Sequence, residues 1–205
     1  IARVDELLAR GLPEGSLERI ALLVARADEN GTAAHRIHAR GYLASAHLLG
    51  GRPDAALEAS ETGMRIAREV RNPAYGGLEA KRARALLALG DLAAAREISE
   101  RLVVEADRNS NLYRSALLAH SEVLIAADAV GERVRIESSL REVADIARRI
   151  GRPEMQADVC RARAHLARVL GDAAGWEREL REALRLYTEM DATGWMERIA
   201  AELAS

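Results

Sequence analysis

The 205-residue sequence contains one cysteine, no phenylalanine and only 3% aromatic residues. Cys160 alone cannot form an internal disulfide or a cysteine-cluster metal site, and we expect it to be a buried, unreactive small side chain. No apolar run approaches the ~20 residues that a helix needs to cross a bilayer, and no core of a signal peptide is visible. These absences favour a protein of the reducing cytoplasm with no membrane partner.

The sequence also has no excess of charge of one sign, because it contains 30 basic and 32 acidic residues. A net charge of −2 gives no reason to expect direct binding to nucleic acid or to an anionic membrane. The sequence has no glycine-rich phosphate loop, no His-Glu-x-x-His helix and no acidic calcium loop. His35 and His38 are three residues apart, but no third metal ligand is evident nearby. We therefore expect no enzymatic activity, no cofactor and no metal.

Glycine, in contrast, recurs at a nearly fixed step. Five glycines follow one another at intervals of about 40 residues, a period typical of stacked structural repeats. The intervals deviate from this value by at most one, and two of the glycines stand in the same Leu-Gly-Asp triplet, at Gly90 and Gly171. The five are Gly11, Gly51, Gly90, Gly131 and Gly171.

Between the glycines, apolar residues recur at helical spacing and no useful period-2 alternation appears. The fold class predicted is therefore all-α, a solenoid of stacked antiparallel helix pairs forming a single domain. The expected helices are about 15–28, 32–49, 53–70, 73–89, 91–106, 112–130, 132–150, 154–170, 173–190 and 195–203. The expected repeat units are about 1–30, 31–72, 73–110, 111–151 and 152–191, with a capping helix in 192–205.

Small residues recur at two fixed offsets from the glycines, where the helices of a pair should cross. Small side chains there let the axes approach to the short end of the ~8–10 Å range. Seven residues before the last four glycines lie Ala44, Ala83, Leu124 and Ala164, and five residues after them lie Ala56, Ala95, Ile136 and Trp176.

A helix–turn–helix unit with Leu-Gly-Asp at its turn and these offsets resembles the tetratricopeptide repeat (TPR). The usual TPR step is about 34 residues, so the longer step of this chain indicates longer helices. The resemblance implies a right-handed superhelix. The stretch from Leu180 to Arg198 is further similar to the C-terminal TPR region of bacterial signal-transduction ATPase regulators, of the LuxR type or linked to adenylate cyclases. That similarity implies a regulatory module of a bacterial protein, attached to an ATPase, cyclase or DNA-binding domain.

The first unit is shorter than the others, since about 18 helical residues precede each later glycine and only ten precede Gly11. The sequence opens inside a helical pattern, and we expect it to be a fragment of a longer protein. Val4, Leu7 and Leu8 should then form an exposed apolar patch. Such a patch favours self-association or fraying at this end.

In TPR arrays the first helix of each pair lines the concave groove, which identifies candidate contact residues. They give the groove a basic character, so we expect it to prefer an acidic segment of a protein or peptide partner. A solvated face, with Asp158 and Arg161 pairing at a separation of three residues, is the alternative. The candidates are His38, Ser45, Arg84, Ser121, Arg161, His165 and Arg168.

The leading functional hypothesis is a non-catalytic protein–protein interaction module that regulates an attached effector. The alternative is a superhelix that closes on a small-molecule effector, which would favour a pocket of polar and aromatic side chains. Tyr42 is the only aromatic residue near the predicted groove, which weighs against that alternative. An enzyme is the least favoured hypothesis, for want of any catalytic constellation.

Overall fold

The computed structural model describes residues 2–12, 15–71 and 76–204, and within these ranges every regular element is a helix. The predicted all-α fold is therefore confirmed. The expected start of one helix at Pro73 lies outside the described residues. The helices are α1 (Ala2–Ala9), α2 (Ser16–Asn30), α3 (Ala33–Leu49), α4 (Pro53–Glu69), α5 (Gly76–Ala88), α6 (Leu92–Glu105), α7 (Asn111–Asp128), α8 (Arg133–Ile150), α9 (Pro153–Val169), α10 (Ala173–Glu189) and α11 (Thr193–Leu203).

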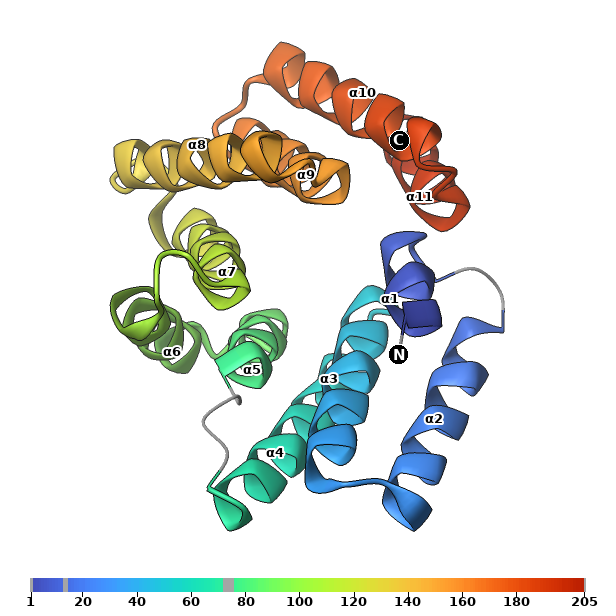
Figure 1. The fold of residues 1–205 in the computed structure, drawn as a ribbon. Helices are drawn as coiled ribbons and strands as arrows, with labels where there is room; N and C mark the ends of the chain where they lie inside the picture. The colour runs from blue at the N-terminus through green and yellow to red at the C-terminus, as the bar shows by residue number, and fades with distance from the viewer. Residues whose placement is uncertain (1, 13–14, 72–75, 205) are drawn as a thin grey trace.

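Consecutive helices pack in antiparallel pairs, and the pairs curve round until α11 lies beside α1 (Figure 1). The first helices of successive pairs also contact one another, α3 with α5, α5 with α7 and α7 with α9. Together these four helices form the inner side of the curve, which we call the inner face. The stacked helix pairs predicted from the glycine spacing are thus confirmed.

Four of the glycine turns share one hydrogen-bonding pattern. Gly11, Gly51, Gly90 and Gly171 have φ of 79°, 67°, 86° and 75°, a left-handed conformation that favours glycine. Each N–H donates to the carbonyl oxygen three residues back, and the next N–H donates to the carbonyl five residues before it. Gly131 differs, because its N–H donates instead to the Asp128 carboxylate at 2.8 Å. At Gly131, a hydrogen bond to a side chain therefore stabilises the turn in place of the left-handed backbone conformation.

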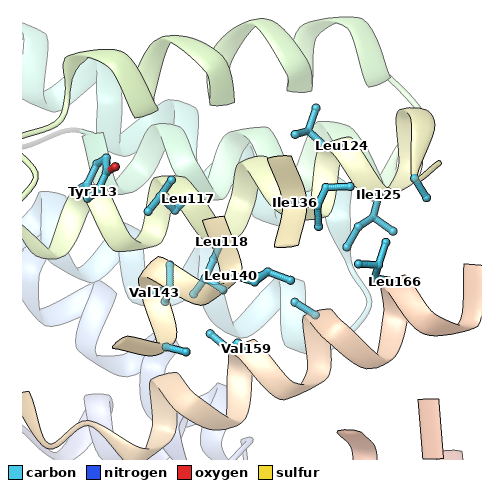
Figure 2. Packing of buried hydrophobic residues seen from close by; sticks show 13 residues of the cluster. Tyr113, Leu117, Leu118, Leu124, Ile125, Ile136, Leu140, Val143, Val159 and Leu166 are labelled. Carbon is cyan, nitrogen blue, oxygen red and sulfur yellow. The ribbon is translucent and has the colours of Figure 1, made fainter. Parts of the chain in front are cut away.

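The two offsets predicted as crossing points lie in the core. Ala44, Ala83 and Ala56 are 0% exposed, so the axes meet where no bulky side chain intervenes. Leu124 and Ile136 replace small residues in the next pair and are also fully buried, in the cluster shown in Figure 2. Trp176 is only partly buried, against the last cluster.

The two ends of the curve are joined by backbone contact, which the sequence pattern did not predict. The N–H of Gly194, in α11, donates to the carbonyl oxygen of Arg10 at 3.0 Å. Arg10 Nη2 lies 3.5 Å from a carboxylate oxygen of Asp191. Arg198 Nη1 donates to the carbonyl oxygen of Leu49 at 2.7 Å. We call the contact of 10–11 and Leu49 with 191–198 the clasp, and it closes the solenoid into a ring.

The first helix is more buried than the sequence pattern predicts. Val4 is only 8% exposed and packs with Ile20 and Ala46, while Leu8 is partly buried against the same cluster. Leu7 is partly buried as well. The prediction of an exposed apolar patch at Val4, Leu7 and Leu8 is therefore wrong, because neighbouring helices cover much of their surface.

The substitution Gly194→Ala should weaken the clasp. An added Cβ would lie 2.5 Å from the Gly11 carbonyl oxygen and 2.8 Å from that of Arg10, and neither backbone atom can rotate away. We expect a loss of about 1–3 kcal/mol in the free energy of unfolding, as for overpacking elsewhere. Urea denaturation followed by circular dichroism measures this loss.

Gly77→Ala is the matched control, because a Cβ at this helical position meets nothing within 4 Å. Alanine should there be neutral or stabilise by up to about 1 kcal/mol. Equal effects of the two substitutions would show that the clasp contributes nothing to stability.

Candidate functional site

The inner face carries charged side chains from three helices. Arg84 of α5 reaches Glu122 of α7 with two parallel bonds, Nε to Oε2 at 2.7 Å and Nη2 to Oε1 at 3.0 Å. This forked geometry is the strong form of an arginine–carboxylate pair. The pair bridges consecutive first helices, so it fixes their relative position as well as the local charge.

Beside this pair, α9 contributes a second and looser one. Arg161 Nη1 lies 3.4 Å from Asp158 Oδ1, and the Tyr187 hydroxyl of α10 donates to the same oxygen at 3.2 Å. The Arg161 guanidinium also lies over the Trp195 ring, with Cζ 3.8 Å from the centroid. Tyr187 and Trp195 stack with their ring centroids 5.3 Å apart. A cation, a carboxylate and two aromatic rings thus converge next to the clasp.

These groups lie largely within the protein, and their surroundings shift their pKa values. Burial raises the pKa of Asp158, against the opposing attraction of Arg161 and Arg84. Burial lowers the pKa of Arg84, but the charge and hydrogen bonds of Glu122 outweigh it, so the net shift is upward. The pKa of His165 is lowered by burial and then by Arg168. His165 therefore acquires charge only at a more acidic pH than a free histidine.

The structure brings together Arg84, Arg161 and His165 but separates the other candidates from them. His38 is exposed between α2 and α3, with Nδ1 2.8 Å from the Ala34 carbonyl oxygen. Ser121 is fully buried and its hydroxyl donates to the Leu117 carbonyl oxygen, so it does not reach the inner face.

Two further candidates take no part in these contacts. Ser45 is partly buried on α3. Arg168 lies further along α9, with Nη1 3.6 Å from Glu202 of α11. The predicted site therefore reduces to α5, α7 and α9, with Arg168 at its margin.

Three members of the site were missed from the sequence, namely Glu122, Tyr187 and Trp195. Glu122 lies one residue beyond the predicted inward position of Ser121, so the offset from the glycine was off by one. Tyr187 and Trp195 belong to α10 and α11, outside the helices that were expected to line the groove. The aromatic pair corrects the view that Tyr42 is the only aromatic residue near the groove.

The chemistry available elsewhere is limited. Cys160 is 8% exposed, and burial with a nearby Glu179 carboxylate raises the pKa of its thiol to about 12. It therefore stays protonated and is a poor nucleophile. Across the described ranges, no group of three or more His, Cys, Asp or Glu side chains could hold a metal ion. None of the described helices combines the length and the apolar composition of a membrane span.

Comparison with known proteins supports the fold and goes no further. No protein-family model matches the chain, and no curated protein matches it. Among solved structures it is similar to one described as "Podosopora anserina putative kinesin light chain nearly identical TPR-like repeats". The TM-score is 0.51 at 17% identity, over 92% of this chain and 93% of that one. A single-residue variant of the same protein matches with a TM-score of 0.51 at 16% identity, over 93% of both chains. At this identity the likeness establishes a TPR-like repeat fold.

Proposed function

We propose that the chain is a non-catalytic interaction module that binds an acidic segment of a partner protein or a neighbouring domain on its inner face. The observation that carries the proposal is the convergence of Arg161, Trp195 and Asp158 with the Arg84–Glu122 pair. These groups suit recognition of a polar segment.

The two kinds of ion pair assign different roles to the arginines. Arg84 is held by a tight fork on Glu122 and acts as a positioning residue for the inner face. Arg161 and Arg168 make long, partly exposed pairs at 3.4 and 3.6 Å. Pairs of this type contribute only ~0–1 kcal/mol, so a carboxylate of the partner can replace Asp158 and Glu202 at little cost. His165 lies between them on the same helix.

The wider context rests on the resemblance of the C-terminal stretch to bacterial regulators. On that basis the module acts in the bacterial cytoplasm and transmits partner binding to an attached ATPase, cyclase or DNA-binding domain. This part of the proposal gains no support from the solved structures, whose likeness concerns the fold.

A small-molecule effector is the second candidate, and the Tyr187–Trp195 stack favours it. A flat, charged metabolite would bind next to this pair, with Arg161 and Asp158 holding its polar groups. Such a ligand would bind without any peptide and would compete with the acidic segment for Arg161.

The proposal predicts that Arg161→Ala combined with Arg168→Ala weakens binding of an acidic segment about five- to tenfold, since two partly exposed charge contacts are lost. The probe is a fluorescein-labelled peptide rich in Glu and Asp, followed by fluorescence anisotropy. Its affinity for the wild type should fall with added salt, because exposed charges are screened over ~8–10 Å. A matching peptide with Gln and Asn should bind poorly.

Arg141→Ala with Arg148→Ala is the control, because these arginines have the same seven-residue spacing on α8, a helix outside the inner face. It should leave the affinity unchanged. Unchanged affinity in the Arg161/Arg168 double variant, with an intact circular dichroism spectrum, would show that these two arginines only solvate the surface and do not bind the partner.

A further inference from the structure

A cavity of about 790 Å³ lies between the second helices α8 and α10, and α9 forms its floor. Cys160 and Arg163 of α9 line it, whereas Asp158, Arg161 and His165 belong to the candidate site on the opposite side of the same helix. The volume is within the ~300–1,000 Å³ that is typical of small-molecule sites. We call this surface the α8–α10 groove.

Arg163, on the floor of the groove, has no bonded partner. Its side chain is partly buried, and no hydrogen bond or ion pair joins its guanidinium to any residue that the structure describes. The guanidinium lies near the Cys160 thiol, where its charge opposes the upward shift of the thiol pKa that burial causes. A free guanidinium offers a rigid fork of donors that suits a phosphate or a carboxylate.

An equivalent arginine in the third pair shows what is missing beside Arg163. Arg82 precedes the glycine of its turn by eight residues, as Arg163 does, and its Nε lies 3.3 Å from Glu61 Oε1 of α4. Glu61 follows the glycine of its own turn by ten residues, and the same count on α8 leads to Arg141. On α8, an arginine therefore stands in the place of the carboxylate.

The packing of α4 on α5 and of α8 on α9 supports this count. A Cβ added at Gly63 of α4 would lie 2.8 Å from Cδ1 of Leu78 on α5. The same two offsets lead to Val143 on α8 and Val159 on α9, which belong to one buried cluster (Figure 2). The two pairs of helices therefore meet in the same register.

The groove is also open between its two walls. The preceding second helix, α6, is joined to the start of α8 by Arg96 and Glu132 at 2.9 Å, and to α8 itself by Arg135 and Glu100 at 3.8 Å. Within the part of the chain that the structure describes, no ion pair joins α8 to α10. A ligand can therefore enter between these helices without breaking a bond between them.

We propose that the α8–α10 groove binds a small organic phosphate, with the phosphate on Arg163 and Arg178. These residues stand eight before and seven after the same glycine, so the antiparallel packing of α9 and α10 brings them to one level of the groove. Arg178 is held only loosely, with Nη2 3.8 Å from Glu179 Oε1. Val159 and Leu186 supply apolar surface for the organic part of the ligand.

The charges that line the groove favour a phosphate over an acidic peptide. Five arginines and three glutamates line it, which leaves an excess of two positive charges. A phosphate monoester carries about −1.5 to −2 charges at pH 7 and balances this excess. All three glutamates belong to α10, so an extended acidic segment would meet carboxylates along that wall. The ligand class therefore differs from the one proposed for the inner face.

The probe is phenyl phosphate, titrated into the folded chain and followed by isothermal titration calorimetry. Benzoate has the same ring with a single charge, and inorganic phosphate lacks the ring. Phenyl phosphate should bind about fivefold more tightly than either, because only it combines the second charge with apolar contact.

Arg163→Ala should weaken phenyl phosphate about tenfold, because a hydrogen bond to a charged group is lost. Arg141→Glu should have a similar effect although Arg141 does not line the groove. The new carboxylate would take the place that Glu61 holds against Arg82, and it would occupy Arg163.

Arg149→Glu is the matched control, because Arg149 is another exposed arginine of α8 outside the lining. It lies about 12 Å further along the helix than Arg141, beyond the ~8–10 Å over which exposed charges act. The same change of charge at this position should alter the affinity less than about twofold.

Three outcomes would overturn the proposal. The first is no saturable binding of phenyl phosphate at millimolar concentration. The second is an equal loss of affinity in the Arg141 and Arg149 variants. The third is equal affinity for phenyl phosphate and inorganic phosphate, which would show that the groove binds only the ion. Arg163→Ala should leave the affinity of the acidic peptide unchanged, so failure of this proposal and failure of the inner-face proposal can be told apart.

Discussion

Trp195→Ala should be the most damaging single substitution considered for this chain, with an expected loss of about 3–5 kcal/mol in the free energy of unfolding. Trp195 is 7% exposed and belongs to the cluster that joins α9, α10 and α11. Removing the indole leaves a cavity and exposes one face of Tyr187. It also deprives the Arg161 guanidinium of the ring beneath it, a contact of about 0.5–2 kcal/mol.

The chain supplies its own control and its own probe for this prediction. It has two tryptophans, and Trp176 is only partly buried, so Trp176→Ala should cost clearly less. In a Trp176→Phe background, Trp195 is the sole indole, and its fluorescence reports on the clasp during urea unfolding. Equal losses from the two alanine substitutions would contradict the central role given to Trp195.

Acidification should destabilise the fold through His120. This side chain is 1% exposed, Ser99 Oγ lies 3.0 Å from its Nδ1, and no hydrogen-bond partner among the described residues reaches its Nε2. Burial lowers its pKa to about 4, with Arg135 the next cause, and the nearby Arg96, Glu100 and Glu132 complete the charges that face it. Protonation would place an unpaired cation in the core.

The sign of the effect follows from the two pKa values. The unfolded histidine, with a pKa of about 6.5, binds a proton between about pH 6.5 and 4 while the folded one does not. Stability is therefore fully present above about pH 6.5 and falls as the pH is lowered, by about 1.4 kcal/mol per unit and about 3 kcal/mol in total. About 2 kcal/mol of this should be lost by about pH 5, before most carboxylates are protonated.

Urea unfolding at pH 7, 6 and 5 measures this slope. His120→Leu should flatten the profile, because an apolar side chain of similar size has no proton to bind. His38→Gln, a change at an exposed histidine, serves as the comparison. A profile for His120→Leu as steep as that of the wild type would remove His120 as the cause.

The regular spacing of the repeats explains why much of the fold could be predicted from the sequence. A helix crossing depends on residues close in sequence, so Ala44 and Ala56 could be placed on either side of Gly51 from spacing alone. The clasp is different, because Arg198 and Leu49 are 149 residues apart and meet only through the summed rotation of all the intervening pairs. No local pattern encodes that sum.

The candidate site was predictable from the sequence only in part. The offsets from the glycines placed Arg84, Arg161 and His165 together, and in the structure they lie near the carboxylates of Glu122 and Asp158. Their role in binding stays a prediction. Their ion-pair partners could not be derived, because Glu122 is 38 residues from Arg84 and a one-residue error in the offset assigned Ser121 to the surface instead. The contact of Trp195 could not be predicted for a different reason. Trp195 belongs to α11 and reaches Arg161 of α9 only because the chain folds back at this end.

The clasp also determines how the chain should respond to force. An open solenoid stretches like a spring, because pulling its ends separates each pair a little from the next. In this chain the contact between 10–11 and 191–198 joins the two ends directly, so a pull on the ends strains these bonds before the helix pairs can separate. The ring is therefore stiff at small extensions and becomes compliant once it has opened, so that tension between domains fused to its two ends would be transmitted as an all-or-none event.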